Sequence, residues 1–300
     1  MKTQAMAPRA KAHARLLAAV VLLAAALLPA SLRAEEKALW PFFAFDNGVG
    51  RGRWTPAEQA ATLKELRYDG ISYNYTNNRD LAERIRAFRQ SGLKIFAMYC
   101  PVRLPAGYDP SLKEAIRMLK GSDTMLWMTM GGGRPGADDD RAVKLLGEVA
   151  DLAQESGLRI ALYPHAGNYV ATADDALRLV KKAGCKNVGV SINLCHELMA
   201  GNGPRLGEIL QAALPHLFLV SINGADKPVP GKRMGWNQLI QPLGQGDFDV
   251  LGLLQALKRS NYRGPIGLQC YAVPGDHKEN LTRSMTAWKK YTAALAGEDK

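Results

Sequence analysis

Short apolar runs alternate with longer helical patterns along most of this chain, and the alternation repeats eight times. Apolar and β-branched residues fill each short run, which is typical of parallel strands that are buried on both faces. The predicted strands cover residues 42–45, 70–75, 94–100, 125–130, 159–163, 188–193, 217–222 and 265–270. Strands that alternate with helices in this way predict a parallel sheet joined by crossover helices.

Eight helices are predicted between and after these strands, and two of them have clear start signals. Thr55 followed by Pro56 and Glu58 is a helix-capping pattern, and Thr172 with Asp175 is another. The predicted helices cover residues 56–68, 79–91, 110–120, 138–156, 173–184, 204–214, 248–260 and 277–295. Because the turn after the first strand has no Gly-x-Gly-x-x-Gly motif, the pattern favours a single closed (β/α)8 TIM barrel, an α/β fold, over a doubly wound sheet.

The N-terminal segment, residues 1–34, differs from the rest of the chain and predicts a signal peptide. Residues 1–15 contain four basic residues and no acid, and residues 16–30 form an apolar run. That run is shorter than the roughly 20 residues of a membrane span, and small residues follow it up to Ala34. We therefore expect cleavage near Ala34, export to the periplasm or beyond the cell, and no stable membrane insertion afterwards. An uncleaved anchor is the alternative, because Leu32 stands where a small residue is expected.

The barrel domain is expected to cover residues 35–300, a length typical of one TIM barrel. Without residues 1–34 the formal net charge falls from +11 to +6. The remaining basic residues form neither a run of five or six nor a stripe interleaved with aromatic residues, so no nucleic-acid partner is expected. The four cysteines lack Cys-x-x-Cys spacing and are expected to be buried free thiols. No pattern in the sequence indicates an oligomeric state.

Polar and aromatic residues stand at the predicted C-terminal ends of the strands, where TIM barrels carry their chemistry. Tyr73, Tyr75 and Tyr99 end two neighbouring strands and offer ring faces with hydroxyl groups, which suits a carbohydrate. Asp46, Asn47, Gln269 and Tyr271 lie at the ends of the first and last strands. The sequence therefore predicts a site for a small-molecule carbohydrate.

Five segments of the second half carry a family resemblance. They are Ala161–His165, Ser191–His196, Val220–Asp226, Pro242–Asp249 and Gly267–Gln269. These segments resemble the xylose-isomerase-like TIM barrel superfamily, which includes sugar-phosphate isomerases and epimerases and the apurinic/apyrimidinic endonuclease family 2. The resemblance implies a TIM barrel and a carbohydrate-related activity.

The resemblance also locates the usual metal site of that superfamily, where a glutamate, an aspartate, a histidine and a second glutamate hold a divalent cation. The corresponding residues here are Tyr163, Asn193, Ser221 and Gln269. These side chains offer only neutral oxygen and nitrogen donors to a hard cation. We therefore expect no metal and no other cofactor. A variant zinc site at His165, His196 and Asp226 is the alternative.

His165 and His196 follow consecutive strands, and imidazole exchanges protons near neutral pH. We expect both to be catalytic, moving a proton beside the carbonyl of a sugar or oxidised sugar in an isomerase, epimerase or lyase reaction. The expected substrate-binding residues are Tyr99, Tyr163, Asn193, Asn223, Lys227, Trp236 and Gln269. A non-catalytic sugar-binding protein, with both histidines structural, is the main alternative. The neutral metal positions and the export signal disfavour a DNA-repair endonuclease.

The segment after the seventh strand carries two further predictions. A lid that closes over a sugar is expected from Lys227, Lys232, Arg233 and Trp236, with a solvated loop as the alternative. Asp247 is expected to cap the helix at 248–260, and Asp249 to lie in its first turn.

Overall fold

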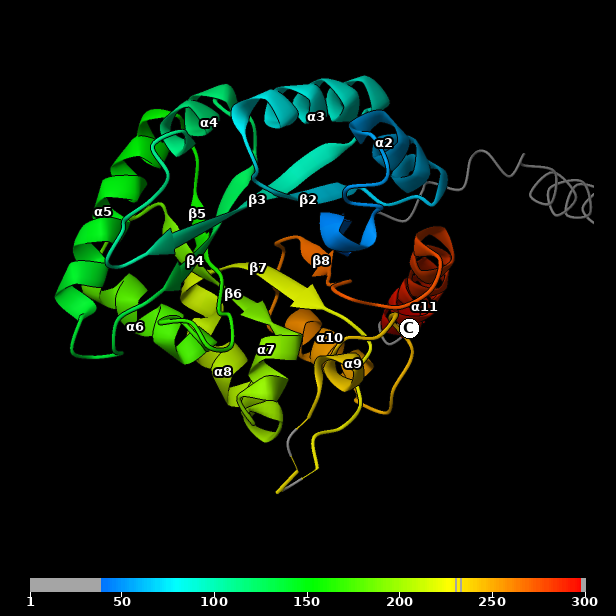
Figure 1. Ribbon diagram of the computed structural model, residues 1–300. Coiled ribbons are helices and arrows are strands. Elements are labelled where there is room, and N and C mark those ends of the chain that lie inside the picture. Colours follow the sequence, from blue (N-terminus) through cyan, green and yellow to red (C-terminus); the bar gives the residue numbers. More distant parts are fainter. Residues whose placement is uncertain (1–38, 230, 233, 298–300) are drawn as a thin grey trace, which may run out of the picture. The chain divides into compact units, whose positions relative to one another are not determined.

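Eight parallel strands pair in sequence order and close into a barrel in the computed structural model (Figure 1). The structure describes residues 39–229, 231–232 and 234–297, so the predicted signal peptide and Arg233 lie outside the described residues. The strands are β1 (Phe42–Phe45), β2 (Gly70–Asn74), β3 (Lys94–Arg103), β4 (Met125–Gly131), β5 (Ile160–Leu162), β6 (Val188–Asn193), β7 (Leu217–Ile222) and β8 (Ile266–Leu268). Strand β1 pairs with both β2 and β8, which closes the ring and confirms the predicted fold.

Helices surround the strands, and eight of them in the described part of the chain correspond to predicted ones (Figure 1). They are α2 (Pro56–Glu65), α3 (Asn78–Ser91), α4 (Leu112–Met118), α5 (Asp139–Glu155), α6 (Ala173–Ala183), α8 (Leu206–Ala213), α10 (Val250–Arg259) and α11 (His277–Gly297). Two short helices, α7 (Leu194–Met199) and α9 (Trp236–Leu239), were not predicted. Helix α7 begins directly after β6 and has no side-chain cap, so no sequence signal marks its start.

The predicted caps are confirmed at two helices and wrong at a third. Thr55 and Glu58 form a capping box at α2, and Thr172 forms one at α6. At α10 the capping residue is Asp249, which accepts a hydrogen bond from the Gly252 N–H at 2.9 Å. The backbone of residue 248 is still bonded to the loop after β7, so the helix starts later than predicted.

Alternating residues of the strands fill the barrel with aromatic rings. Phe43, Phe45, Trp127 and Tyr163 are buried together inside it, whereas Phe42 packs outward against the helices. The ring of Phe45 lies 5.3 Å from that of Trp127, which in turn lies 4.7 Å from that of Tyr163. Tyr163 therefore stands on a packed aromatic column, which restricts the position of its ring.

The four cysteines form no disulfide, and three of them, Cys100, Cys195 and Cys270, are buried. Burial raises the pKa of each buried thiol to about 12, so these thiols stay protonated at neutral pH. No helix in the described residues is both long and apolar enough to cross a bilayer.

Candidate functional site

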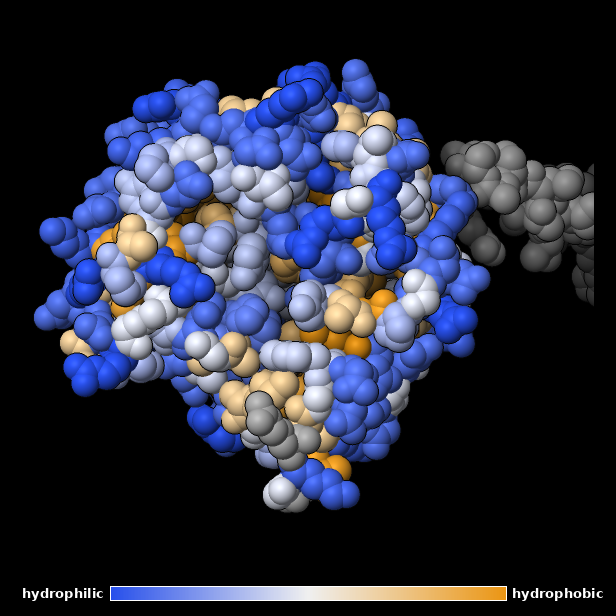
Figure 2. Space-filling model, in the orientation of Figure 1, coloured by the Kyte–Doolittle hydropathy of each residue, from blue (hydrophilic) through white to orange (hydrophobic). Residues whose placement is uncertain are grey.

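A cavity of about 250 Å³ opens at the C-terminal ends of the strands. Its walls combine aromatic rings with amides, two imidazoles and a guanidinium group. The lining residues are Phe45, Asn47, Arg51, Asn74, Tyr99, Tyr163, His165, His196, Trp236, Ile240, Gln269 and Tyr271. Apolar residues are visible in the middle of the face shown in Figure 2, between hydrophilic ones. Drug-sized ligands fill roughly 300–1,000 Å³, so this cavity suits a smaller molecule such as a monosaccharide.

A second cavity, of about 330 Å³, lies at the N-terminal ends of β3 and β4. Two of its charged residues, Lys94 and Asp123, pair with each other at 3.2 Å. TIM barrels carry their chemistry at the opposite end, so the first cavity is the candidate site.

Three residues predicted to bind substrate lie outside this cavity. Asn193 is fully buried, donates to the Pro164 carbonyl at 3.0 Å, and accepts from Ser221 at 3.0 Å. Asn223 is also fully buried and donates to two backbone carbonyls. Lys227 is exposed, with its backbone N–H bonded to Asp247 at 2.6 Å. The two asparagines therefore hold loops in place, and Lys227 and Lys232 lie on the exposed loop after β7.

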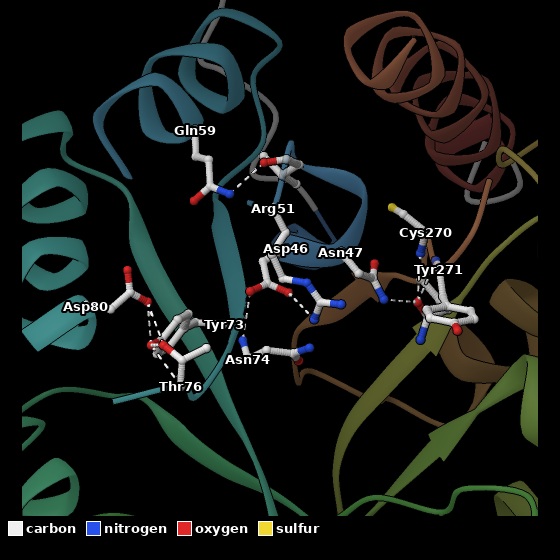
Figure 3. Close-up of polar contacts among 12 residues, drawn as sticks. Asp46, Asn47, Arg51, Gln59, Tyr73, Asn74, Thr76, Asp80, Cys270 and Tyr271 are labelled. Atoms are coloured by element: carbon white, nitrogen blue, oxygen red, sulfur yellow. Dashed lines mark hydrogen bonds and ion pairs between the residues drawn. The ribbon is translucent and has the colours of Figure 1, made fainter. Parts of the chain in front are cut away.

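Strand β2 contributes a different residue from those predicted. The hydroxyl of Tyr73 donates to Asp80 of α3 at 2.6 Å (Figure 3). The hydroxyl of Tyr75 contacts that of Ser111 at 2.6 Å. Successive strand residues point to opposite faces, so Asn74 points inward while Tyr73 points toward the helices. Tyr73 and Tyr75 are therefore not part of the cavity wall, and Asn74 is.

His196 has no free ring nitrogen. Its Nδ1 accepts a hydrogen bond from the Ala166 N–H at 3.2 Å, so the ring proton must be on Nε2. That Nε2 lies 3.3 Å from the Tyr163 hydroxyl and donates to it. Burial, with a smaller contribution from His165, lowers the pKa of His196 to about 3. At neutral pH this histidine is a neutral hydrogen-bond donor to Tyr163.

His165 has the opposite arrangement. Its Nδ1 lies 3.0 Å from the Ala166 carbonyl, which can only accept, so Nδ1 carries the proton. The Nε2 atom then keeps its lone pair, and the side chain lines the cavity. The two rings are 4.4 Å apart between centroids, yet only His165 presents a base.

Tyr163 is held by two donors. Gln269 Oε1 accepts from the backbone N–H groups of Cys270 and Tyr271, both at 2.9 Å, which fixes the orientation of its amide. Its Nε2 therefore donates to the Tyr163 hydroxyl, at 3.0 Å. Because that hydroxyl also accepts from His196, its own proton is left for a ligand. Burial raises the pKa of Tyr163 well above its usual range, so the phenol stays protonated.

The four positions that would carry the family's metal do not suit a divalent cation. Asn193 and Ser221 are bonded to each other, and Gln269 is bonded to Tyr163. All four donor groups are neutral and already paired, whereas Mg²⁺ or Mn²⁺ prefers carboxylates. The alternative zinc site at His165, His196 and Asp226 is also unsuited to a metal, because both ring nitrogens of His196 already form hydrogen bonds. In the described residues no three His, Cys, Asp or Glu side chains cluster as metal ligands.

Arg51 and Asn74 were missed by the sequence analysis. Arg51 lies between Gly50 and Gly52 in the loop after β1, and this glycine spacing was the available signal. Asn74 could have been found from the alternation along β2, once the inward face was known.

Comparisons with known proteins agree with the fold. The sequence profile of the xylose isomerase-like TIM barrel family matches residues 61–291. A 3-dehydroshikimate dehydratase of Pseudomonas aeruginosa is 32% identical over 129 residues, which are 42% of this chain and 20% of that protein. An uncharacterised protein of Methanocaldococcus jannaschii is 25% identical over 133 residues, 43% of each chain. The chain therefore spans less than half the length of either relative.

Solved structures of two sugar epimerases and of an epimerase-like protein have a similar backbone. A D-tagatose 3-epimerase-like protein superposes with a TM-score of 0.67 at 16% identity, covering 87% of this chain and 100% of that one. The D-psicose 3-epimerase of Clostridium cellulolyticum has a TM-score of 0.66 at 15% identity, covering 85% and 99%. The 3-keto-D-glucoside 4-epimerase of E. coli has a TM-score of 0.62 at 16% identity, covering 79% and 94%. At these identities the similarity concerns the fold.

Proposed function

The chain belongs to the xylose isomerase-like TIM barrel family, and from that premise we propose that it is a carbohydrate isomerase-like enzyme that moves a proton beside a carbonyl group. His165 is the base, and the Tyr163 hydroxyl is the hydrogen-bond donor to the carbonyl oxygen. The observation that carries this proposal is the pattern of hydrogen bonds: Tyr163 accepts twice and keeps its proton for the ligand, while His165 keeps a free Nε2.

The proposed reaction has two steps. His165 Nε2 takes the proton from the carbon beside the carbonyl, and the electron pair of that C–H bond forms the double bond of an enediolate. The former carbonyl oxygen becomes negative and accepts the hydrogen bond from Tyr163. The imidazolium then returns its proton to the neighbouring carbon, and the hydroxyl proton passes between the two oxygens through the phenol.

His196 and Gln269 act as positioning residues in this proposal. Each donates an N–H to the phenol oxygen of Tyr163, which stabilises negative charge that develops there as the phenol gives up its proton. Because the pKa of His196 is about 3, its donor role does not change across the neutral pH range. The sequence predicted that both histidines are catalytic; in this proposal His165 exchanges a proton with the substrate and His196 positions Tyr163.

A single free imidazole favours isomerisation over epimerisation. An epimerase returns the proton to the opposite face of the same carbon, which generally needs a second acid or base. Of the lining residues in the described part of the chain, His165 is the imidazole with a free nitrogen. We therefore expect proton return to the same face of the substrate. A lyase reaction that begins with the same proton removal is the related possibility.

The donor set supports a reaction without a divalent cation. The positions that bind metal in the family hold neutral, mutually bonded side chains, so the Tyr163 hydroxyl would supply the stabilisation of negative charge. This part of the proposal is tested by adding a chelator to the assay below.

The test is proton exchange. Candidate aldoses, ketoses and sugar acids are incubated with the protein in D2O and EDTA, and loss of the C–H signal is followed by NMR. His165→Ala should lower the exchange rate by roughly 10²-fold or more, and Tyr163→Phe should lower it to a similar degree. The control is His216→Ala, at the far end of the barrel, which should exchange at the wild-type rate.

The alternative function, sugar binding without catalysis, predicts a different result. A ligand would then bind in calorimetry and raise the melting temperature, yet no exchange would occur with wild-type protein. Exchange that is unaffected by His165→Ala would contradict the proposed role of this residue.

A further inference from the structure

We infer that the ligand of this cavity is a sugar acid, whose carboxylate binds Arg51 and whose hydroxyl groups bind Asn47 and Asn74. The inference builds on the proposed function, because it names the substrate class for the same site. It rests on three independent features of the wall formed by β1, β2 and the loop after β1.

The first feature is the charge of the cavity. Among the described residues that line it, Arg51 is the one with a permanent charge, and none is an aspartate or glutamate. His196 is neutral because its pKa is about 3. A carboxylate placed here would therefore meet the Arg51 cation, while the Asp46 carboxylate that pairs with Arg51 at 3.8 Å is not part of the lining.

The second feature is the turn that holds Arg51. The N–H groups of Arg53 and Trp54 both donate to the Gly50 carbonyl at 2.8 Å, which closes a tight turn. Gly50 has a φ of 62°, and a Cβ there would lie 2.2 Å from the Trp54 ring. Only glycine fits this position, and the turn that it forms is followed by Arg51, which lines the cavity.

Asp46 anchors Arg51 without using up its donors. Figure 3 shows the guanidinium directed toward the Asp46 carboxylate, at 3.8 Å between Nη1 and Oδ1. That distance is an ion pair and exceeds hydrogen-bond length, and Asp46 Oδ2 is bonded to the Asn74 N–H at 2.9 Å. A guanidinium has five N–H donors, so Arg51 can still bind a carboxylate through two parallel hydrogen bonds.

The third feature is a pair of unused acceptors. Asn47 donates its amide to Gln269 Oε1 at 2.9 Å, which fixes the position of Asn47 Oδ1. That atom and Asn74 Oδ1 are both buried and have no hydrogen-bond partner in the described structure. Buried acceptors are normally paired, and we assign hydroxyl groups of the ligand as the donors to these two. Hydroxyl donors beside a carboxylate describe a sugar acid.

A phosphate is the other anion that Arg51 could attract. Phosphate sites usually combine several donors, such as a helix N-terminus or a glycine-rich loop of N–H groups. In this turn the N–H groups of Arg53 and Trp54 are already bonded to Gly50. The structure therefore favours a carboxylate.

The inference is tested by calorimetry with matched ligands: a hexuronate, its uncharged methyl ester, the parent hexose and the hexose 6-phosphate. The acid should bind roughly 10- to 100-fold more tightly than its ester, the usual range for hydrogen bonds to a charged group. Arg51→Met should remove this preference. Arg53→Met, in the same turn but outside the cavity wall, is the control and should keep it.

Each outcome is decisive. Equal binding of acid and ester by wild-type protein, or tighter binding of the phosphate, would overturn the inference. Because that comparison uses wild-type protein, it holds even if Arg51→Met fails to fold, and Arg51→Lys then tests the loss of bidentate binding. Proton exchange on neutral sugars without acid preference would leave the proposed function standing and refute the sugar acid. Tight binding of the acid without proton exchange would support the sugar acid as ligand and refute the proposed catalytic function.

Discussion

Asp46 is a buried carboxyl group, and its replacement by asparagine should change how stability depends on pH. The side chain is 1% exposed, and burial raises its pKa from 3.8 to about 6, against the opposing effects of the Asn74 N–H and Arg51. Between these two pH values the unfolded chain releases the proton while the folded protein keeps it. Stability therefore falls as the pH rises through this range.

The size of the effect follows from the shift. Each pKa unit corresponds to 1.36 kcal/mol, so the wild-type protein should lose roughly 3 kcal/mol between about pH 4 and pH 7 through this group. Asp46→Asn lacks the titrating group. As the pH rises from about 4 to about 7, the wild type loses this stability and the variant does not. The variant should therefore become more stable relative to the wild type by about 3 kcal/mol.

Urea denaturation at several pH values measures this difference. Glu148→Gln, on the exposed face of α5, is the control and should follow the wild-type curve. If the curves of wild type and Asp46→Asn run parallel from pH 4 to pH 7, the carboxyl group titrates normally. The account of Asp46 as a desolvated anchor for Arg51 would then be wrong.

Further predictions concern the site, the metal, the turn and the N-terminus. His196→Ala should lower kcat more than it changes KM, and His196→Gln, whose amide can still donate to Tyr163, should restore part of it with the wild-type pH profile. EDTA should leave the melting temperature unchanged, and one tightly held equivalent of metal after purification would contradict this. Gly50→Ala should cost more than about 1 kcal/mol in urea denaturation and weaken acid binding, because φ is positive and the Trp54 ring is in the way. N-terminal sequencing of the exported protein should begin near Glu35, and an intact N-terminus in the membrane fraction would show an anchor instead.

The barrel could be predicted because its strands are short apolar runs with clear ends. Strands β1, β6 and β7 have the predicted bounds. Strand β8 starts one residue later than predicted, because Pro265 has no N–H to donate to the ladder. Helix α7 follows β6 without a turn residue, so no local signal separated it from a loop.

The site was predicted only in part, and the reason is geometric. Tyr163 and His165 line the candidate cavity as expected, because the barrel rule and the family motif both point to the end of β5. Both faces of a barrel strand are buried, so composition does not reveal which face of β2 points inward, and Tyr73 was chosen in place of Asn74. Arg51 was not predicted, because its position depends on the path of a turn flanked by Gly50 and Gly52, and the sequence does not fix that path. Asn193 ends β6 as predicted, yet it is fully buried and does not line the cavity.

The orientation of the Gln269 amide has a consequence for how such a site can change over generations. Its Nε2 is the donor that leaves the Tyr163 proton for the ligand. The family's glutamate at this position would be an acceptor at neutral pH, so the phenol would turn its proton toward the carboxylate. Under the proposed mechanism, one amide-to-acid exchange therefore disables the phenol before the other metal ligands exist. The amide that serves the phenol and the acid that would hold a metal are therefore mutually exclusive at position 269 under the proposed mechanism.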